Sequence, residues 1–141
     1  MDYAAAIARM DANRPPAWEL LNGGTIAYDA ATDRVVTEWV AETRHCHSVP
    51  GHPKGGIVQG GIITGWLDAA MAAACLVRDS SVGVASLEIK VSFLRSAHPG
   101  PHRAYGRIVR QGRNIAFLEA ELYDRNDTLL AQASSTAFLR A

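Results

Sequence analysis

The sequence predicts one α+β domain, in which about six mostly antiparallel strands pack against a single long helix. Residues 61–78 place apolar side chains at helical spacing. Two segments before this helix and four after it alternate apolar and polar residues, as half-buried strands do. The 141 residues, 48% of them hydrophobic and 20% charged, are enough for one buried core. We therefore expect residues 1–141 to form a single domain.

The first 22 residues are expected to form a helical extension of that domain. Residues 2–12 suit a short helix, because Asp2 can cap its start. Pro15 ends the helix, since the residue before a proline avoids helical geometry and Pro16 follows directly. Residues 17–22 fit one more short helical turn.

Two strands are expected next, over residues 25–30 and 34–41, followed by a loop over 42–56 that is rich in proline and glycine. The long helix then begins near Gly60 and carries Trp66 on its broad apolar stripe. Trp18 and Trp39 are expected either to pack the sheet or to line a pocket; the pattern leaves both open.

Four strands complete the chain, over residues 84–94, 103–111, 114–124 and 128–139. The first alternates with a period of two, and so does the third. The connection 96–102 is expected to carry His98 and His102 on the surface. In residues 84–94 the two predicted faces are Ala85, Leu87, Ile89, Val91 and Phe93 against Ser86, Glu88, Lys90 and Ser92.

The composition excludes several classes of function. The formal net charge is zero, so no bulk field attracts nucleic acid or an anionic membrane. The only cysteines, Cys46 and Cys75, do not form a disulfide framework. No signal-peptide pattern opens the sequence, and no uncharged run is long enough to span a bilayer. A cytoplasmic protein with no nucleic-acid or membrane partner is the expectation.

The stretch GGIVQGGIITGWLDAAM, residues 55–71, carries the chemistry. A helix N-terminus has backbone N–H groups without intrahelical partners, and glycines let a ligand approach them closely. Gly60 and Gly61 could therefore donate to a carbonyl oxygen that develops negative charge. Asp68 follows two turns later among small neighbours, including Gly65, where a substrate or a second subunit could come close. A solvated acid on a surface helix is the alternative reading.

Together with GVASLEIKVSFLRSA and GRIVRQGRNIAFLEAELYDRNDTLLAQASSTAFL, this stretch resembles the hotdog-fold acyl-CoA thioesterases of the phenylacetate-pathway (PaaI-type) branch. The resemblance covers about residues 20–140. Gln59 stands where the family motif often has His, Gly60 and Gly61 match its glycine pair, and Asp68 matches its acid. The resemblance implies a curved antiparallel sheet wrapped around one long helix, in homodimers with shared active sites that pair into tetramers.

The same resemblance implies the reaction: hydrolysis of an acyl-CoA thioester, with Gly60 polarising the carbonyl and Asp68 of the other protomer as nucleophile or general base. Ser86 matches a position where some relatives hold the water or substrate, and Gln59 and Gly61 shape the helix start. No metal or redox cofactor is implied, because coenzyme A is part of the substrate. His52 could replace an amide side chain that many relatives place at Pro53.

Two departures and two alternative functions stay open at this point. Pro53 stands where many relatives carry Asn or Gln, and Ala72 where one related branch carries Thr. The Pro53 departure motivates a non-catalytic acyl-CoA or lipid-binding module as the alternative. A hydratase of the same broad fold is less favoured, because no His follows Asp68 within the helix. An acyl-CoA substrate carries phosphates, which guanidinium groups suit, so Arg95 and Arg113 are the candidate anion-binding residues. The histidines of residues 45–52 favour a polar loop over a metal site.

Overall fold

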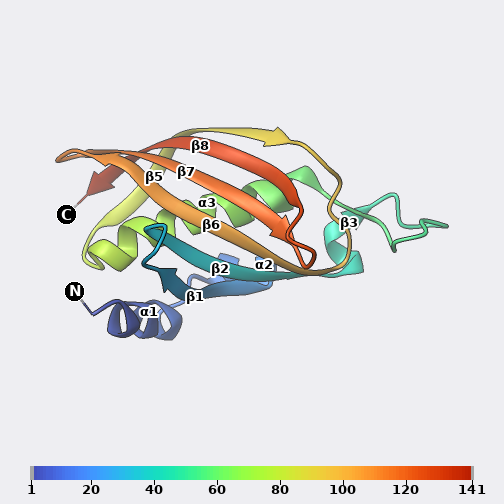
Figure 1. Cartoon of the computed structure of the whole chain (residues 1–141), viewed down its shortest axis with the longest axis horizontal. Helices are drawn as coiled ribbons and strands as arrows, with labels where there is room; N and C mark the ends of the chain where they lie inside the picture. Colours follow the sequence, from blue (N-terminus) through green and yellow to red (C-terminus); the bar gives the residue numbers. More distant parts are fainter. Residues whose placement is uncertain (1, 141) are drawn as a thin grey trace.

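The computed structural model describes residues 2–140, apart from the side chain of Ile26. Six antiparallel strands form one curved sheet in the order β1-β2-β6-β7-β8-β5. One long helix, α3 (Gly60–Arg78), runs across one face of the sheet (Figure 1). The strands are β1 Gly23–Asp29, β2 Arg34–Ala41, β5 Gly83–Phe93, β6 Gly100–Gln111, β7 Ile115–Asp124 and β8 Leu129–Arg140. The predicted α+β fold, with a sheet wrapped around one long helix, is confirmed.

The N-terminal extension forms two helices, α1 (Tyr3–Ala12) and α2 (Pro16–Leu21). The Asp2 carboxylate caps α1 by accepting a hydrogen bond from the Ala5 N–H at 3.0 Å. α1 lies beside β1 (Figure 1). The predicted loop 42–56 contains a short 3-10 turn, Thr43–His45, and a two-residue strand β3, Cys46–His47, which pairs with β4, Ile57–Val58. These short pieces depend on long-range pairing and leave no period in the sequence.

The core lies between α3 and the sheet, and three tryptophans occupy it. Trp39 and Trp66 are fully buried and stacked with ring centroids 6.4 Å apart, while Trp18 meets Trp39 edge-on at 5.8 Å. Trp18 and Trp39 therefore pack the sheet. α3 is the one helix in residues 2–140 long and apolar enough by composition to cross a bilayer, with a mean hydropathy of 1.5, and ten of its residues are buried in this core.

Glycine sets how closely α3 approaches the sheet. A Cβ on Gly106 in β6 would overlap the carbonyl oxygen of Ala70 and lie 2.9 Å from the backbone nitrogen of Met71. A Cβ on Gly65 would lie 2.9 Å from a methyl group of Leu21. The expectation that Gly65 leaves room for a substrate or a second subunit is therefore wrong, because α2 fills that space.

The strict alternation expected in β5 is wrong at its start. A β-bulge lies between Ser86 and Glu88. The residues before the bulge therefore face the side of the sheet opposite to the one that strict alternation predicts. Ser86 therefore faces α3 together with Ile89, whereas Leu87 is 61% exposed. A one-residue insertion of this kind depends on pairing with β8, which the local pattern does not encode.

The expected surface position of His102 is also wrong. β6 begins at Gly100, earlier than its pattern suggests, and His102 points toward the core. Its ring lies 5.2 Å from that of Trp66, and its Nδ1 lies 2.9 Å from the carbonyl oxygen of Gly100. Burial lowers the pKa of His102, which keeps the ring neutral at physiological pH.

Candidate active site

The carboxylate of Asp68 is held at the junction of α3 and the edge strand β5. Asp68 is half-buried in the third turn of α3. The Ser86 hydroxyl donates a hydrogen bond to Asp68 Oδ1 at 2.5 Å. The bulge in β5 makes this contact possible, because it turns Ser86 toward the helix. The structure therefore brings together two of the residues predicted from the sequence, with one carboxylate oxygen oriented by a neutral donor.

A second polar feature is the free amide at the start of α3. The side-chain oxygen of Gln59 accepts hydrogen bonds from the N–H groups of Gly61 at 2.5 Å and Ile62 at 3.3 Å. The carbonyl oxygen of Gln59 accepts from Ile62 at 2.9 Å and Ile63 at 3.3 Å. Within residues 2–140 the N–H of Gly60 has no acceptor, so it is the donor that a ligand can use.

This arrangement separates the roles of the two glycines. The N–H of Gly61 is occupied by Gln59, and a Cβ on Gly61 would lie 2.7 Å from the Gln59 side-chain oxygen. Gly61 therefore leaves room for the cap, whereas Gly60 offers its N–H. Gln59 is a helix cap, a role that is usually taken by Ser, Thr, Asp or Asn.

Phe93 is a site residue that the sequence did not reveal. A Cβ on Gly60 would lie 3.2 Å and 3.4 Å from two carbons of the Phe93 ring, so this ring covers Gly60. Phe93 is 54% exposed, although its alternation predicted a core position. It forms an apolar wall beside the free amide, and its contact with Gly60 joins segments too distant in sequence for a local pattern to show.

The two polar features do not meet within one chain. Gly60 and Asp68 are eight residues apart on a continuous helix, which separates them by about 12 Å along its axis. One small reacting group cannot touch both at that distance. A site that uses both groups needs the second one from another copy of the chain.

The remaining predicted residues are spread over the surface. Arg95 is exposed and follows Phe93 closely, so it lies near Gly60. Arg113 lies in the turn between β6 and β7, at the end of the sheet where β5 begins, and so away from Gly60 in the same chain. His52 lies on the loop before β4, with its ring 5.3 Å from that of His98.

Cysteine and metal chemistry find little support at this site. Cys75 lies on α3 two turns beyond Asp68, and burial raises the pKa of its thiol to about 11, so the thiol is protonated at neutral pH. The ring of His45 accepts the N–H of Glu42 on Nδ1 and places Nε2 against a carbonyl oxygen. Over the described range 2–140, no three His, Cys, Asp or Glu side chains form a group able to hold a metal ion.

Comparisons with known proteins find thioesterases and esterases. The model of the thioesterase superfamily matches residues 55–131, which include Gly60, Asp68 and Ser86. A protein of Saccharolobus solfataricus, provisionally named an esterase, is 28% identical over 86 residues, which make up 61% of each chain. A second one from the same organism is 29% identical over 58% of this chain and 55% of its own. The chain thus matches less than two thirds of the length of these curated relatives.

Solved structures match over nearly the whole chain. A Ralstonia eutropha protein, described provisionally as a thioesterase related to phenylacetic acid degradation, is 28% identical. It covers 97% of this chain and 99% of its own, with a TM-score of 0.81. The PaaI protein of E. coli, from the phenylacetic acid degradation operon, is 17% identical and covers 99% of this chain and 94% of its own, with a TM-score of 0.80. At that identity the likeness concerns the fold alone.

Proposed function

The chain belongs to the thioesterase superfamily, and from this premise we propose that it hydrolyses an acyl-CoA thioester to the free acid and coenzyme A. The observation that carries the proposal is the presence of both an oriented carboxylate and a helix-start amide whose N–H is free. Asp68 is held by Ser86, and Gly60 keeps its N–H free. These are the two groups that acyl transfer requires, one to activate water or attack the carbonyl and one to stabilise the oxyanion.

The proposed reaction follows from these two groups. The N–H of Gly60 donates to the thioester oxygen, which makes the carbonyl carbon more electrophilic. The carboxylate of Asp68 either removes a proton from the water that attacks this carbon or attacks it directly, in which case water then cleaves the anhydride. The C–S bond breaks, and the coenzyme A thiolate leaves and takes up a proton. No metal or redox cofactor takes part in either version.

The separation of Gly60 and Asp68 makes a homodimer part of the proposal. β5 is an edge strand of eleven residues, and most of them are exposed. Long uncovered edge strands tend to pair with another strand. Leu87, Phe93 and Leu94 are 61%, 54% and 50% exposed along this segment, which favours a partner over solvent. We place a second copy of the chain here, with its β5 antiparallel to the first.

The charges on β5 favour one register for this pair. Residues opposite each other in an antiparallel pair face the same side of the sheet. A two-fold axis that relates two copies of β5 therefore lies at one residue, which is paired with its own copy. With Ile89 on the axis, Glu88 lies opposite the partner's Lys90, and two opposite-charge pairs form. An axis at Glu88 or Lys90 would instead place like charges opposite each other.

The same register also assembles the site. Because Leu87 is the extra residue of the bulge, this register places Ser86 opposite the partner's Val91, on the same face as the ring of the partner's Phe93, which covers the partner's Gly60. Asp68 of one subunit, bonded to Ser86, then lies beside the helix start of the other. The charge pattern and the chemistry thus point independently to the same pairing. Pairing of dimers into tetramers and a cytoplasmic location complete the proposal.

Replacing Asp68 by Asn tests the reaction, because the amide keeps the shape and loses the charge and basicity. We expect D68N to lose nearly all release of free thiol across a panel of aromatic and aliphatic acyl-CoA esters. Wild-type turnover by D68N would refute the role of Asp68. Tight acyl-CoA binding by the wild-type protein without turnover of any ester would favour the non-catalytic binding module instead.

A further inference from the structure

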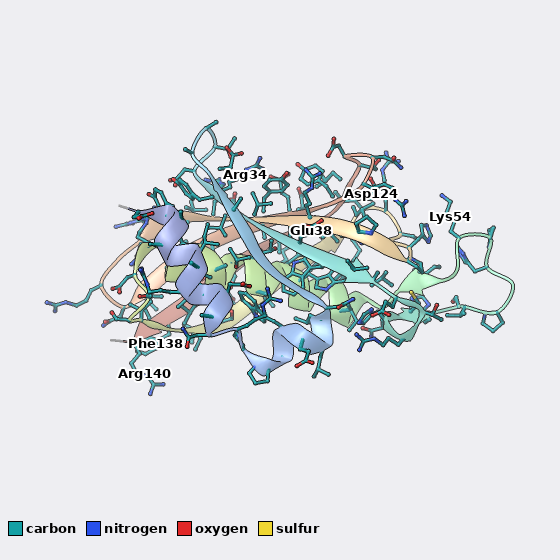
Figure 2. The ribbon with its side chains drawn as sticks, turned by 90° about the horizontal axis from the view of Figure 1, so that it is seen from below. Arg34, Glu38, Lys54, Asp124, Phe138 and Arg140 are labelled. Carbon is teal, nitrogen blue, oxygen red and sulfur yellow. The ribbon has the colours of Figure 1, made fainter. Side chains whose placement is uncertain are left out.

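A cavity of about 300 Å³ lies outside the contact between α3 and β5. It lies at the end of the molecule where Figure 2 shows Lys54 on its loop and Asp124 at the end of β7. Four segments of the chain form its wall: Lys54, residues 96–102, residues 124–126 and Leu130. The sequence offered no sign that these segments meet.

The cavity carries an excess of positive charge. Lys54 and Arg125 are both exposed, and neither forms an ion pair within residues 2–140. The one acid among the described lining residues is Asp124, whose Oδ1 accepts the N–H groups of Asn126 at 2.8 Å and Thr128 at 3.1 Å. That carboxylate therefore shapes the turn, and two permanent cations face one acid. The excess charge suits an anionic ligand.

One of the two positive groups, the guanidinium of Arg125, lies against the main chain. Gly100 has φ +129°, and a Cβ there would overlap the guanidinium of Arg125, so this arginine lies directly against the main chain of Gly100. His98 Nδ1 lies 2.8 Å from the carbonyl oxygen of Gly56, which places the ring hydrogen on Nδ1. Ser96 adds a hydroxyl to the same wall. The planar guanidinium of an arginine can bind phosphate oxygens through two parallel hydrogen bonds.

The cavity is joined directly to the start of α3. The Val58 N–H donates to the carbonyl oxygen of Ala97, in the cavity wall, at 2.8 Å. Gly60 follows Val58 by two residues, at most about 7 Å along the chain. The cavity and the free amide of Gly60 are thus close neighbours. Coenzyme A separates its thiol from its phosphates by a long flexible arm, which can span such a gap.

We infer that this cavity binds a phosphate group of coenzyme A, with Arg125 and Lys54 as the charged donors. The inference rests on the proposed function for the identity of the ligand. It assigns the anion-binding role to residues other than Arg95 and Arg113, which the sequence alone suggested. The ligand phosphate is either the pyrophosphate or the 3′-phosphate, and the choice of ligand distinguishes the two.

The test measures binding of coenzyme A and dephospho-coenzyme A by calorimetry to wild type, Arg125→Gln, Lys54→Gln and Arg9→Gln. Arg9 is an exposed arginine on α1, so its variant loses the same charge away from the cavity. We expect the first two variants to weaken coenzyme A binding at least about tenfold, and Arg9→Gln to leave it unchanged. If only coenzyme A responds, the cavity holds the 3′-phosphate; if both ligands respond, it holds the pyrophosphate. Wild-type binding by Arg125→Gln would overturn the inference.

A kinetic measurement separates this inference from the proposed reaction. With an acyl-CoA ester, Arg125→Gln should raise KM about tenfold at unchanged kcat. With the same acyl group on pantetheine, which has no phosphate, kcat/KM should stay at the wild-type value. An equal loss on both esters would overturn the cavity's role. If no ester is hydrolysed but coenzyme A binding still depends on Arg125, the phosphate site stands and the proposed hydrolysis fails.

Discussion

Replacement of Gly60 by proline isolates the amide on which the proposed chemistry depends. Proline removes the N–H and is well tolerated at the first position of a helix. Gln59, the preceding residue, has φ −64° and ψ 137°, the extended conformation that a residue before proline adopts. The cap from Gln59 to Gly61 and Ile62 does not involve the Gly60 N–H, so it should survive. The variant should therefore keep α3 and lose only the donor.

The expected size of the effect follows from that missing donor. Loss of one oxyanion donor typically lowers kcat about 10²–10³-fold, or about 2.7–4 kcal/mol in the barrier. Gly60→Ala is the matched control, because it keeps the N–H and adds a Cβ at 3.2 Å from the exposed Phe93 ring, which can move slightly. In an assay of free-thiol release, G60P should fall by this amount and G60A much less. Equal activities of the two variants would refute the role of the amide.

Three further predictions concern Ser86, the packing of α3 and a buried histidine. Ser86→Ala removes a hydrogen bond to the Asp68 carboxylate, so kcat should fall about 10–100-fold. Ser86→Thr is the control, because it keeps a hydroxyl. A fully active S86A would exclude this contact from the mechanism. Gly106→Ala forces a Cβ into the backbone of Ala70, so the free energy of unfolding in urea should drop by at least about 3 kcal/mol. An unchanged midpoint of urea unfolding would contradict the close packing of α3 on the sheet. Burial lowers the pKa of His102 below 6.5, so the unfolded chain binds a proton that the folded chain does not, and stability should fall as the pH drops below 6.5. The free energy of unfolding should fall less steeply with decreasing pH in His102→Gln than in the wild type. Equal slopes would disprove the role of His102 in this pH dependence.

Much of the fold follows from local patterns. The apolar residues of α3 recur at helical spacing, and in β7 Leu118 and Leu122 alternate with Glu119 and Glu121. The pattern of apolar residues is therefore enough to predict both elements. Gly60 and Asp68 could be predicted as site residues from the same local pattern, because both lie on this one continuous helix.

Features that depend on pairing between distant segments could not be predicted. The bulge beside Leu87 exists only against β8, and it decides that Ser86 reaches Asp68. The ring of Phe93 meets Gly60 because β5 crosses the helix start. Each of these contacts joins segments far apart in sequence, whereas periodicity reports only on neighbours along the chain.

The shared site is tested most directly by mixing two inactive variants, D68N and G60P, after unfolding them together and refolding. Each variant lacks a different half of the site. A mixed dimer with shared sites contains one site in which both halves are intact and one in which both are altered. Random pairing makes about half of the dimers mixed, so about a quarter of the wild-type activity should return.

The control for this mixture is D68N refolded with a G60P/D68N double variant, which leaves every site without an acid and should stay inactive. Recovery of about a quarter of wild-type thiol release in the first mixture alone is the predicted result. If that mixture is as inactive as its parents although mixed dimers have formed, then the amide of Gly60 and the carboxylate of Asp68 do not act across the subunit boundary.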